Sequence, residues 1–165
     1  MFGFFINPPI ARYYMQGLNT TPVHGHTALF RVYGMIGLGL MLFCLRALLP
    51  GPAWKDGPLK FAFWSINWGL GLMVLLSVLP VGLLQAWASL EYGMWYARSA
   101  EFMQTGLMNT LRWMRVIGDT LFAAGAAVLG WFVLGLLTGH SFDHTAQVRA
   151  GESSVHQTPE TAVGN

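Results

Sequence analysis

The sequence contains little charge and almost no cysteine for its length. Only 10% of its 165 residues are Asp, Glu, Lys or Arg, and Cys44 is the single cysteine. One cysteine excludes an internal disulfide and a metal site built from several thiolates. The formal net charge of +2 is small, and no basic stripe with interleaved aromatic residues is present, which argues against nucleic acid as a partner.

Motifs of soluble enzymes are also missing. The sequence has no internal repeat, glycine-rich phosphate loop, nucleophile elbow or zinc-protease motif. Hydrophobic residues, by contrast, make up 54% of the chain, and the mean hydropathy is +0.47. This composition is typical of a protein embedded in a lipid bilayer. The predicted fold class is therefore all-α, a polytopic transmembrane helical bundle.

Three apolar stretches are long enough to cross a membrane. They cover about residues 21–49, 61–87 and 116–138, and each exceeds the roughly 20 residues needed to cross a hydrocarbon core of about 30 Å. Pro80 is expected to kink the second stretch. The polar residues of that stretch are predicted to hydrogen-bond to neighbouring helices; they are Ser65, Asn67, Ser77 and Gln85.

The two ends of the chain differ in character. Residues 1–9 are interpreted as the end of a fourth span, broken by two prolines and followed by a surface loop over residues 10–20. Met1 is then expected to be an internal methionine of a longer protein. A transmembrane segment over residues 1–139 precedes residues 140–165, which are almost devoid of apolar side chains and are predicted to form a disordered polar tail.

Two histidines lie close together at the start of the first span. Thr21 suits the N-cap and Pro22 the first helical position, so His24 and His26 should occupy the first turn or two of a helix. At about 100° per residue, side chains two positions apart point to nearly opposite sides. Two such rings cannot share a metal ion, but each could hold a separate large, flat cofactor.

The residues that follow each histidine on the same face can be listed from helical spacing. The His24 face continues with Ala28, Arg31 and Met35, and the His26 face with Phe30, Tyr33 and Gly37. An alternative interpretation remains open, in which both rings lie near the membrane surface and hydrogen-bond with water or carbonyl groups.

The third span carries a run of small residues, 123–127, that would permit close packing against another helix. Asp119 lies four residues after Arg115, a spacing that favours an ion pair within the helix. A proton-relay role for Asp119 is the alternative to this structural role.

Several stretches together resemble one enzyme family. TTPVHGHTALF, GMWYARS and RVIGDTLFAAGA occur in the order found at the C-terminal end of the quinol-dependent nitric oxide reductases, members of the haem-copper oxidase superfamily. The resemblance covers nearly the whole chain except the tail. It implies a C-terminal fragment of the haem-copper oxidase fold, with three full spans plus the end of a fourth, in the inner membrane of a bacterial cell.

The resemblance also implies roles for the histidines. His24 would be the axial ligand of the high-spin haem b3, and His26 one axial ligand of the low-spin haem b. The family joins two NO molecules into N2O and water, using electrons from a membrane quinol. Its non-haem iron ligands and the second axial histidine of haem b lie on earlier helices, which nothing in this sequence matches. The chain is therefore expected to require the upstream part of the reductase and to be inactive alone.

Arg31 departs from the family, which commonly has a small residue there. An unpaired guanidinium within the bilayer costs about 2.5–3.5 kcal/mol on insertion scales, so this residue either finds a partner outside the chain or marks a decaying copy. Two other functions remain open. An oxygen reductase of the same superfamily shares the histidine pair, and a non-catalytic membrane subunit or haem-binding module would carry no chemistry.

Overall fold

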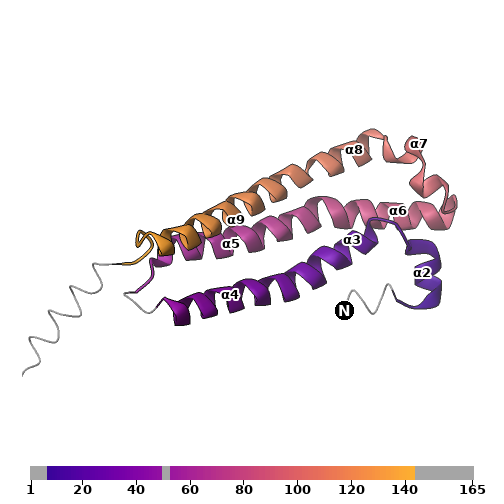
Figure 1. Ribbon diagram of the computed structural model, residues 1–165. Helices are drawn as coiled ribbons and strands as arrows, with labels where there is room; N and C mark the ends of the chain where they lie inside the picture. The colour runs from indigo at the N-terminus through magenta and orange to yellow at the C-terminus, as the bar shows by residue number, and fades with distance from the viewer. Residues whose placement is uncertain (1–6, 50–52, 144–165) are drawn as a thin grey trace, which may run out of the picture.

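The computed structural model describes residues 7–49 and 53–143, and over these residues the chain is a bundle of three long helices (Figure 1). The first consists of α3 (Thr20–His24), η1 (Gly25–Gly34) and α4 (Met35–Leu48); the second of α5 (Asp56–Met73), η2 (Val74–Val78) and α6 (Leu79–Glu91); the third of α8 (Gly106–Trp113) and α9 (Arg115–Leu137). Short helices α2 (Pro9–Met15), η3 (Tyr96–Arg98) and α7 (Ala100–Met103) lie at one end. The prediction of an all-α membrane bundle is confirmed, because all three long helices are long and apolar enough to span a bilayer.

Several helices begin earlier than the sequence predicted. The second long helix starts at Asp56, because proline is tolerated in the first turn and an acidic residue interacts favourably with a helix N-terminus. The third starts at Gly106, since α8 continues into α9 with a break only at Met114. The loop predicted over residues 10–20 contains α2, which Pro9 initiates as a first-turn residue.

Two of the long helices contain turns that are wider than those of an α-helix. In η1 and η2 the backbone hydrogen bonds follow the π-helical pattern, from residue i to residue i+5. The segment η2 ends immediately before Leu79 and Pro80. Because proline has no N–H and its ring crowds the carbonyl one turn earlier, the expected distortion of this span takes the form of a wide turn that precedes the proline.

The core lies where α5 and α9 touch with almost no side chains between them. A methyl group added to Gly69, Gly118 or Gly125 would lie less than 3.0 Å from the backbone of the opposite helix. Nearer the start of α5, Ala62 and Ile66 form a buried apolar cluster with Leu129 of α9. Of the small-residue run 123–127, only Gly125 is buried and the four alanines are exposed, so the close approach predicted for this run depends on its glycine.

The residues that follow α9 fold back onto the connector before α5. Ser141 is buried and its Oγ donates a hydrogen bond to the carbonyl oxygen of Phe132, at 2.8 Å. The N–H of Lys55 donates to the Ser141 carbonyl at 2.9 Å, and Trp54 pairs with Phe142 in a single antiparallel bridge. Residues 140–143, which the sequence assigned to the polar tail, therefore form an ordered turn. The rest of that predicted tail lies outside the described residues, as do residues 1–6 of the predicted end of a fourth span over residues 1–9.

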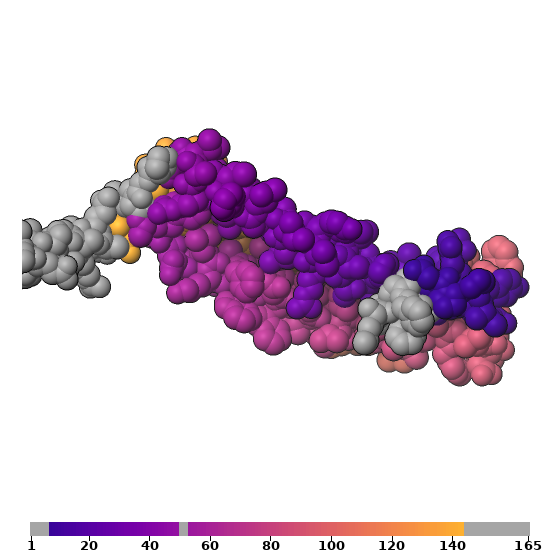
Figure 2. Space-filling model, turned by 90° about the horizontal axis from the view of Figure 1, so that it is seen from below, coloured from indigo at the N-terminus to yellow at the C-terminus, as the bar shows by residue number. Residues whose placement is uncertain are grey.

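The first long helix is the least buried of the three. Neither η1 nor α4 contains a buried residue, whereas half of the most apolar window of the second helix is buried. Figure 2, which looks onto this helix, shows it lying open along its length with the second helix beside it. Many of its apolar side chains consequently face the surroundings of the chain. Phe30, Met35, Leu38 and Leu42 are partly buried against the cluster of Ala62, Ile66 and Leu129.

The contact between α5 and α9 leads to a direct test. Replacing Gly69 by Ala places a methyl group against the backbone of Phe122, and overpacking of this kind costs about 1–3 kcal/mol. The change should lower the thermal midpoint of the helical circular dichroism signal in detergent. Gly71→Ala is the matched control, because nothing lies within 4 Å of its added methyl group; equal effects of the two changes would contradict the proposed contact.

Candidate functional site

The start of the helix that carries the histidines is fixed to the second long helix by one buried amide. Gln85, on α6, is 4% exposed. Its Oε1 accepts hydrogen bonds from the backbone N–H and from Nδ2 of Asn19, at 2.9 and 2.7 Å, and its Nε2 donates to the Ala97 carbonyl at 3.1 Å. The prediction that Gln85 would bond between helices is confirmed. Asn67 behaves differently, since its side chain donates to the Phe63 carbonyl of its own helix.

This anchor replaces the helix cap expected from the sequence. The predicted N-cap, Thr21, lies one residue inside the helix, which begins at Thr20 after Asn19. The side chain of Asn19 makes no cap hydrogen bond because it is engaged by Gln85 instead. Pro22 still lies in the first turn, where its missing N–H is not needed.

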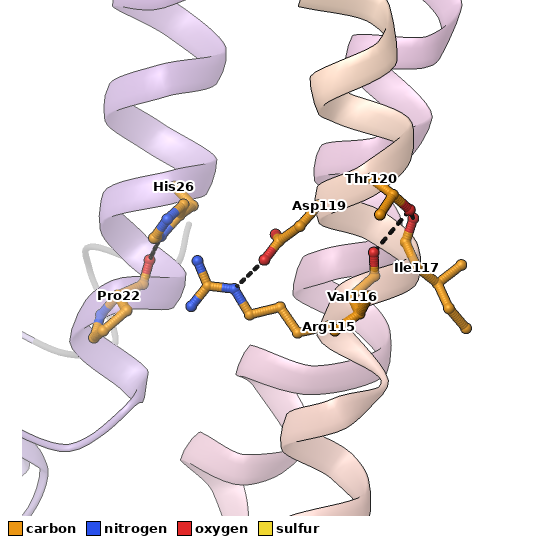
Figure 3. Close-up of polar contacts among 7 residues, drawn as sticks. All are labelled: Pro22, His26, Arg115, Val116, Ile117, Asp119 and Thr120. Carbon is orange, nitrogen blue, oxygen red and sulfur yellow. Dashed lines mark hydrogen bonds and ion pairs between the residues drawn. The ribbon is translucent and has the colours of Figure 1, made fainter.

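His26 has one ring nitrogen held by the backbone. Its Nδ1 lies 2.8 Å from the carbonyl oxygen of Pro22, four residues earlier (Figure 3). A carbonyl can only accept, so Nδ1 carries the proton and Nε2 keeps its lone pair. Metal-binding histidines commonly hold the ring in this way, with one nitrogen bonded to a carbonyl and the other left for the metal.

An open apolar groove of about 730 Å³ adjoins this ring; we call it the His26 groove. It is lined by Thr21, Pro22, Gly25, His26, Leu29, Phe30 and Gly34. Of the residues expected on the His26 face, Phe30 lines this groove, and Tyr33 and Gly37 line a second apolar groove together with Phe30. Leu29 and Gly34 lie three and eight residues after His26, separations that place side chains on one face of a helix.

His24 occupies a different environment. Its residue is half-buried, and its Nδ1 is fully buried without a hydrogen-bond partner in the described part of the chain. Buried polar atoms are nearly always paired, so this nitrogen calls for a hydrogen-bond partner. His26 fits a metal-bearing cofactor by its donor chemistry, through a free and oriented nitrogen; in His24 the ligand atom would be Nε2, because Nδ1 is enclosed by the chain.

The predicted ion pair between Arg115 and Asp119 is confirmed. Arg115 Nε lies 2.9 Å from Asp119 Oδ2, and both side chains are slightly less than half exposed. In Figure 3 the pair extends from α9 on the side of the first long helix, while the Thr120 hydroxyl bonds back to the carbonyls of Val116 and Ile117. The Asp119 carboxylate is thus neutralised within its own helix.

One polar pocket near this pair was not foreseen from the sequence. Its volume is about 690 Å³, and the side chains of Asn19, Ser77, Asn109, Arg112 and Arg115 contribute to its lining. The three-residue spacing of the arginines, which places them on one face of a helix, was the available signal. Its guanidinium and amide donors suit an anionic group rather than a metal ion.

No group of three or more His, Cys, Asp or Glu side chains is brought together within residues 7–49 and 53–143. Any metal held by His24 or His26 would thus have at most two His, Cys, Asp or Glu ligands from this part of the chain. Its other ligands would have to come from a cofactor or from other parts of the protein. This is the pattern of a metal carried by a macrocycle, where the protein contributes axial ligands.

Comparison with known families shows to which family the chain belongs. A family model described as cytochrome c and quinol oxidase polypeptide I matches residues 1–121. The chain belongs to this family. The match includes both histidines, the Gln85 anchor and the Arg115–Asp119 pair, and it places the chain in the haem-copper oxidase superfamily, whose subunit I binds haem. A search of curated proteins gave no match.

The amide anchor can be tested in this family member. Replacing Gln85 by Leu leaves Asn19 without its acceptor and buries the Ala97 carbonyl without its donor, which costs about 1–3 kcal/mol. Chemical unfolding in detergent should shift to lower denaturant concentration. Gln104→Leu serves as the control, because Gln104 is exposed at the C-terminal end of α7. A Gln85→Leu protein as stable as this control would exclude the anchoring role.

Proposed function

We propose that this chain supplies axial histidines to two haems in a membrane nitric oxide reductase, with His26 bound to the iron of haem b and His24 to that of haem b3. The observation that carries the proposal is the His26 ring, whose Nδ1 is fixed by the Pro22 carbonyl at 2.8 Å while the ring adjoins an open apolar groove. Haem would supply the redox-active iron, and the chain would supply oriented imidazoles in a setting of low polarity.

The two rings have the separate environments that this arrangement requires. His26 adjoins the His26 groove, and His24 has a buried Nδ1 in need of a partner. The continuous helix from Thr20 to Leu48 holds both at nearly the same depth. In this proposal one helix lies between two haems, which supports electron transfer from one to the other without a large movement of the protein.

The open first helix supports a requirement for further membrane helices. None of the most apolar window of Thr20–Leu48 is buried, although this helix carries the histidines. We infer that the upstream part of the reductase covers it and contributes the second ligand of haem b and the ligands of a non-haem iron. The lipid bilayer surrounds the remainder, and a membrane quinol serves as the electron donor in the bacterial inner membrane.

Nitric oxide is the proposed substrate because of the stretches GMWYARS and RVIGDTLFAAGA, which resemble the nitric oxide reductases of the superfamily. Oxygen is the second candidate, since the matched family is described by its cytochrome c and quinol oxidases. A non-catalytic haem-binding subunit is the third candidate, favoured by the lack of a three-ligand metal cluster in the described part of the chain.

Haem ligation is tested by spectroscopy on membranes. The chain should show reduced-minus-oxidised bands of b-type haem only when it is co-expressed with the upstream helices of a nitric oxide reductase. His24→Ala and His26→Ala should each remove the bands of a different haem, because each ring would hold one iron. His140→Ala is the control, since His140 is exposed beyond α9; unchanged spectra in both variants would refute the ligand assignment.

The gas that is reduced is tested on the same co-expressing membranes. With quinol as donor they should consume NO and form N2O in a 2:1 ratio, and the purified chain alone should consume none. This outcome follows because the described residues of the chain cannot complete the iron site by themselves. Rapid consumption of O2 without formation of N2O would instead identify an oxygen reductase.

A further inference from the structure

Arg31 lies deep within the first membrane-spanning helix. It is eleven residues after Thr20 and seventeen before Leu48, which places it about 16 Å and about 25 Å from the two helix ends at 1.5 Å per residue. The hydrocarbon core of a bilayer is about 30 Å thick. Arg31 therefore lies about three helical turns or more from either end of the span.

Nothing in the described part of the chain neutralises this charge. Arg31 is exposed, and two ion pairs there join Lys60 to Asp56 at 3.2 Å and Arg115 to Asp119 at 2.9 Å. Both of these acids are thus already paired within their own helices. A cation that lies on a membrane helix without a partner is costly, and such residues normally pair inside a bundle.

One side of the helix around Arg31 lacks contacts as well as a counter-charge, while Phe30, Met35 and Leu38 pack toward α5 and α9. Val32, Ile36 and Leu40 are 49%, 63% and 60% exposed, and the most apolar window of the helix has no buried residue. An exposed helix side that is apolar except for one cation in the middle of the span is suited to contact with another helix rather than with lipid. Lipid phosphate groups lie at the membrane surface, too far from this depth to serve as the counter-charge.

We propose that the exposed side of η1 and α4 is a docking surface for another membrane-spanning helix, and that this helix carries a carboxylate near its middle that pairs with Arg31. A helix is the expected form of the partner because a bilayer requires all backbone hydrogen bonds to be satisfied internally. A carboxylate is the expected chemistry because the guanidinium offers paired donors that match its two oxygens. The proposal does not depend on haem ligation, so the two can fail separately.

The test uses the full chain in phosphatidylcholine vesicles and a synthetic helix of about 20 leucine and alanine residues with one Glu at its centre. A second peptide carries Gln at that position. Energy transfer from the seven tryptophans of the chain to a dansyl group on the peptide reports association. The Glu peptide should bind about tenfold more tightly than the Gln peptide, the range expected for polar contacts between membrane helices.

Three variants identify the origin of this preference. Arg31→Met should abolish it, and Arg31→Lys should retain it because the positive charge remains. Arg12→Met should leave it unchanged, since Arg12 lies on α2, outside the spans. Equal binding of the two peptides by the natural chain, a preference that survives Arg31→Met, or a preference lost in Arg31→Lys would each overturn the proposal.

Discussion

Direct contact between the backbones of α5 and α9 is the constraint on which the rest of the structure depends. Gly69, Gly118 and Gly125 leave no room for a side chain between the two helices, so the helices form one support. Helices in a membrane gain little from the hydrophobic effect when they associate, and close van der Waals packing takes its place. The histidine-bearing helix is then attached to this support at its N-terminal end.

That attachment combines an apolar and a polar part. Val23 packs into a cluster formed by residues of α5 and η2, and Asn19 is held by the buried amide of Gln85. Both contacts lie within a few residues of His24 and His26. The histidines are thus located where the first helix is best fixed, while α4 farther along contains no buried residue. A well-fixed N-terminal part that carries both histidines and an open apolar surface thus coexist on one helix.

The wide turns of η1 modify the geometry of the histidine pair without destroying it. The i to i+5 pattern turns the chain less per residue than an α-helix does, so side chains two residues apart still point to different sides. Leu29, Phe30 and Gly34 line the groove beside His26, and Tyr33 and Gly37 line a second groove with Phe30. Wide turns of this kind occur frequently at functional sites, and this one begins at the residue between the two histidines.

Features that depend on composition or on neighbours within one helix followed from the sequence alone. Long apolar stretches gave the membrane helices, and the four-residue spacing of Arg115 and Asp119 gave their ion pair, because such properties need no knowledge of distant residues. Most of the fold, and the position of both histidines on one membrane helix, could therefore be predicted, although the third long helix begins at Gly106 rather than near residue 116.

The remaining features were decided by the tertiary structure. Asn19 bonds to Gln85, 66 residues away, and is thereby drawn from its role as a helix cap. Gly125 is buried against α5 while the alanines beside it are exposed, and Ser141 is buried with a hydrogen bond to Phe132 although the sequence placed it in a polar tail. Each outcome depends on which helices meet and in which register. Local periodicity carries no information about such contacts, since their free energy arises only once distant segments are packed together.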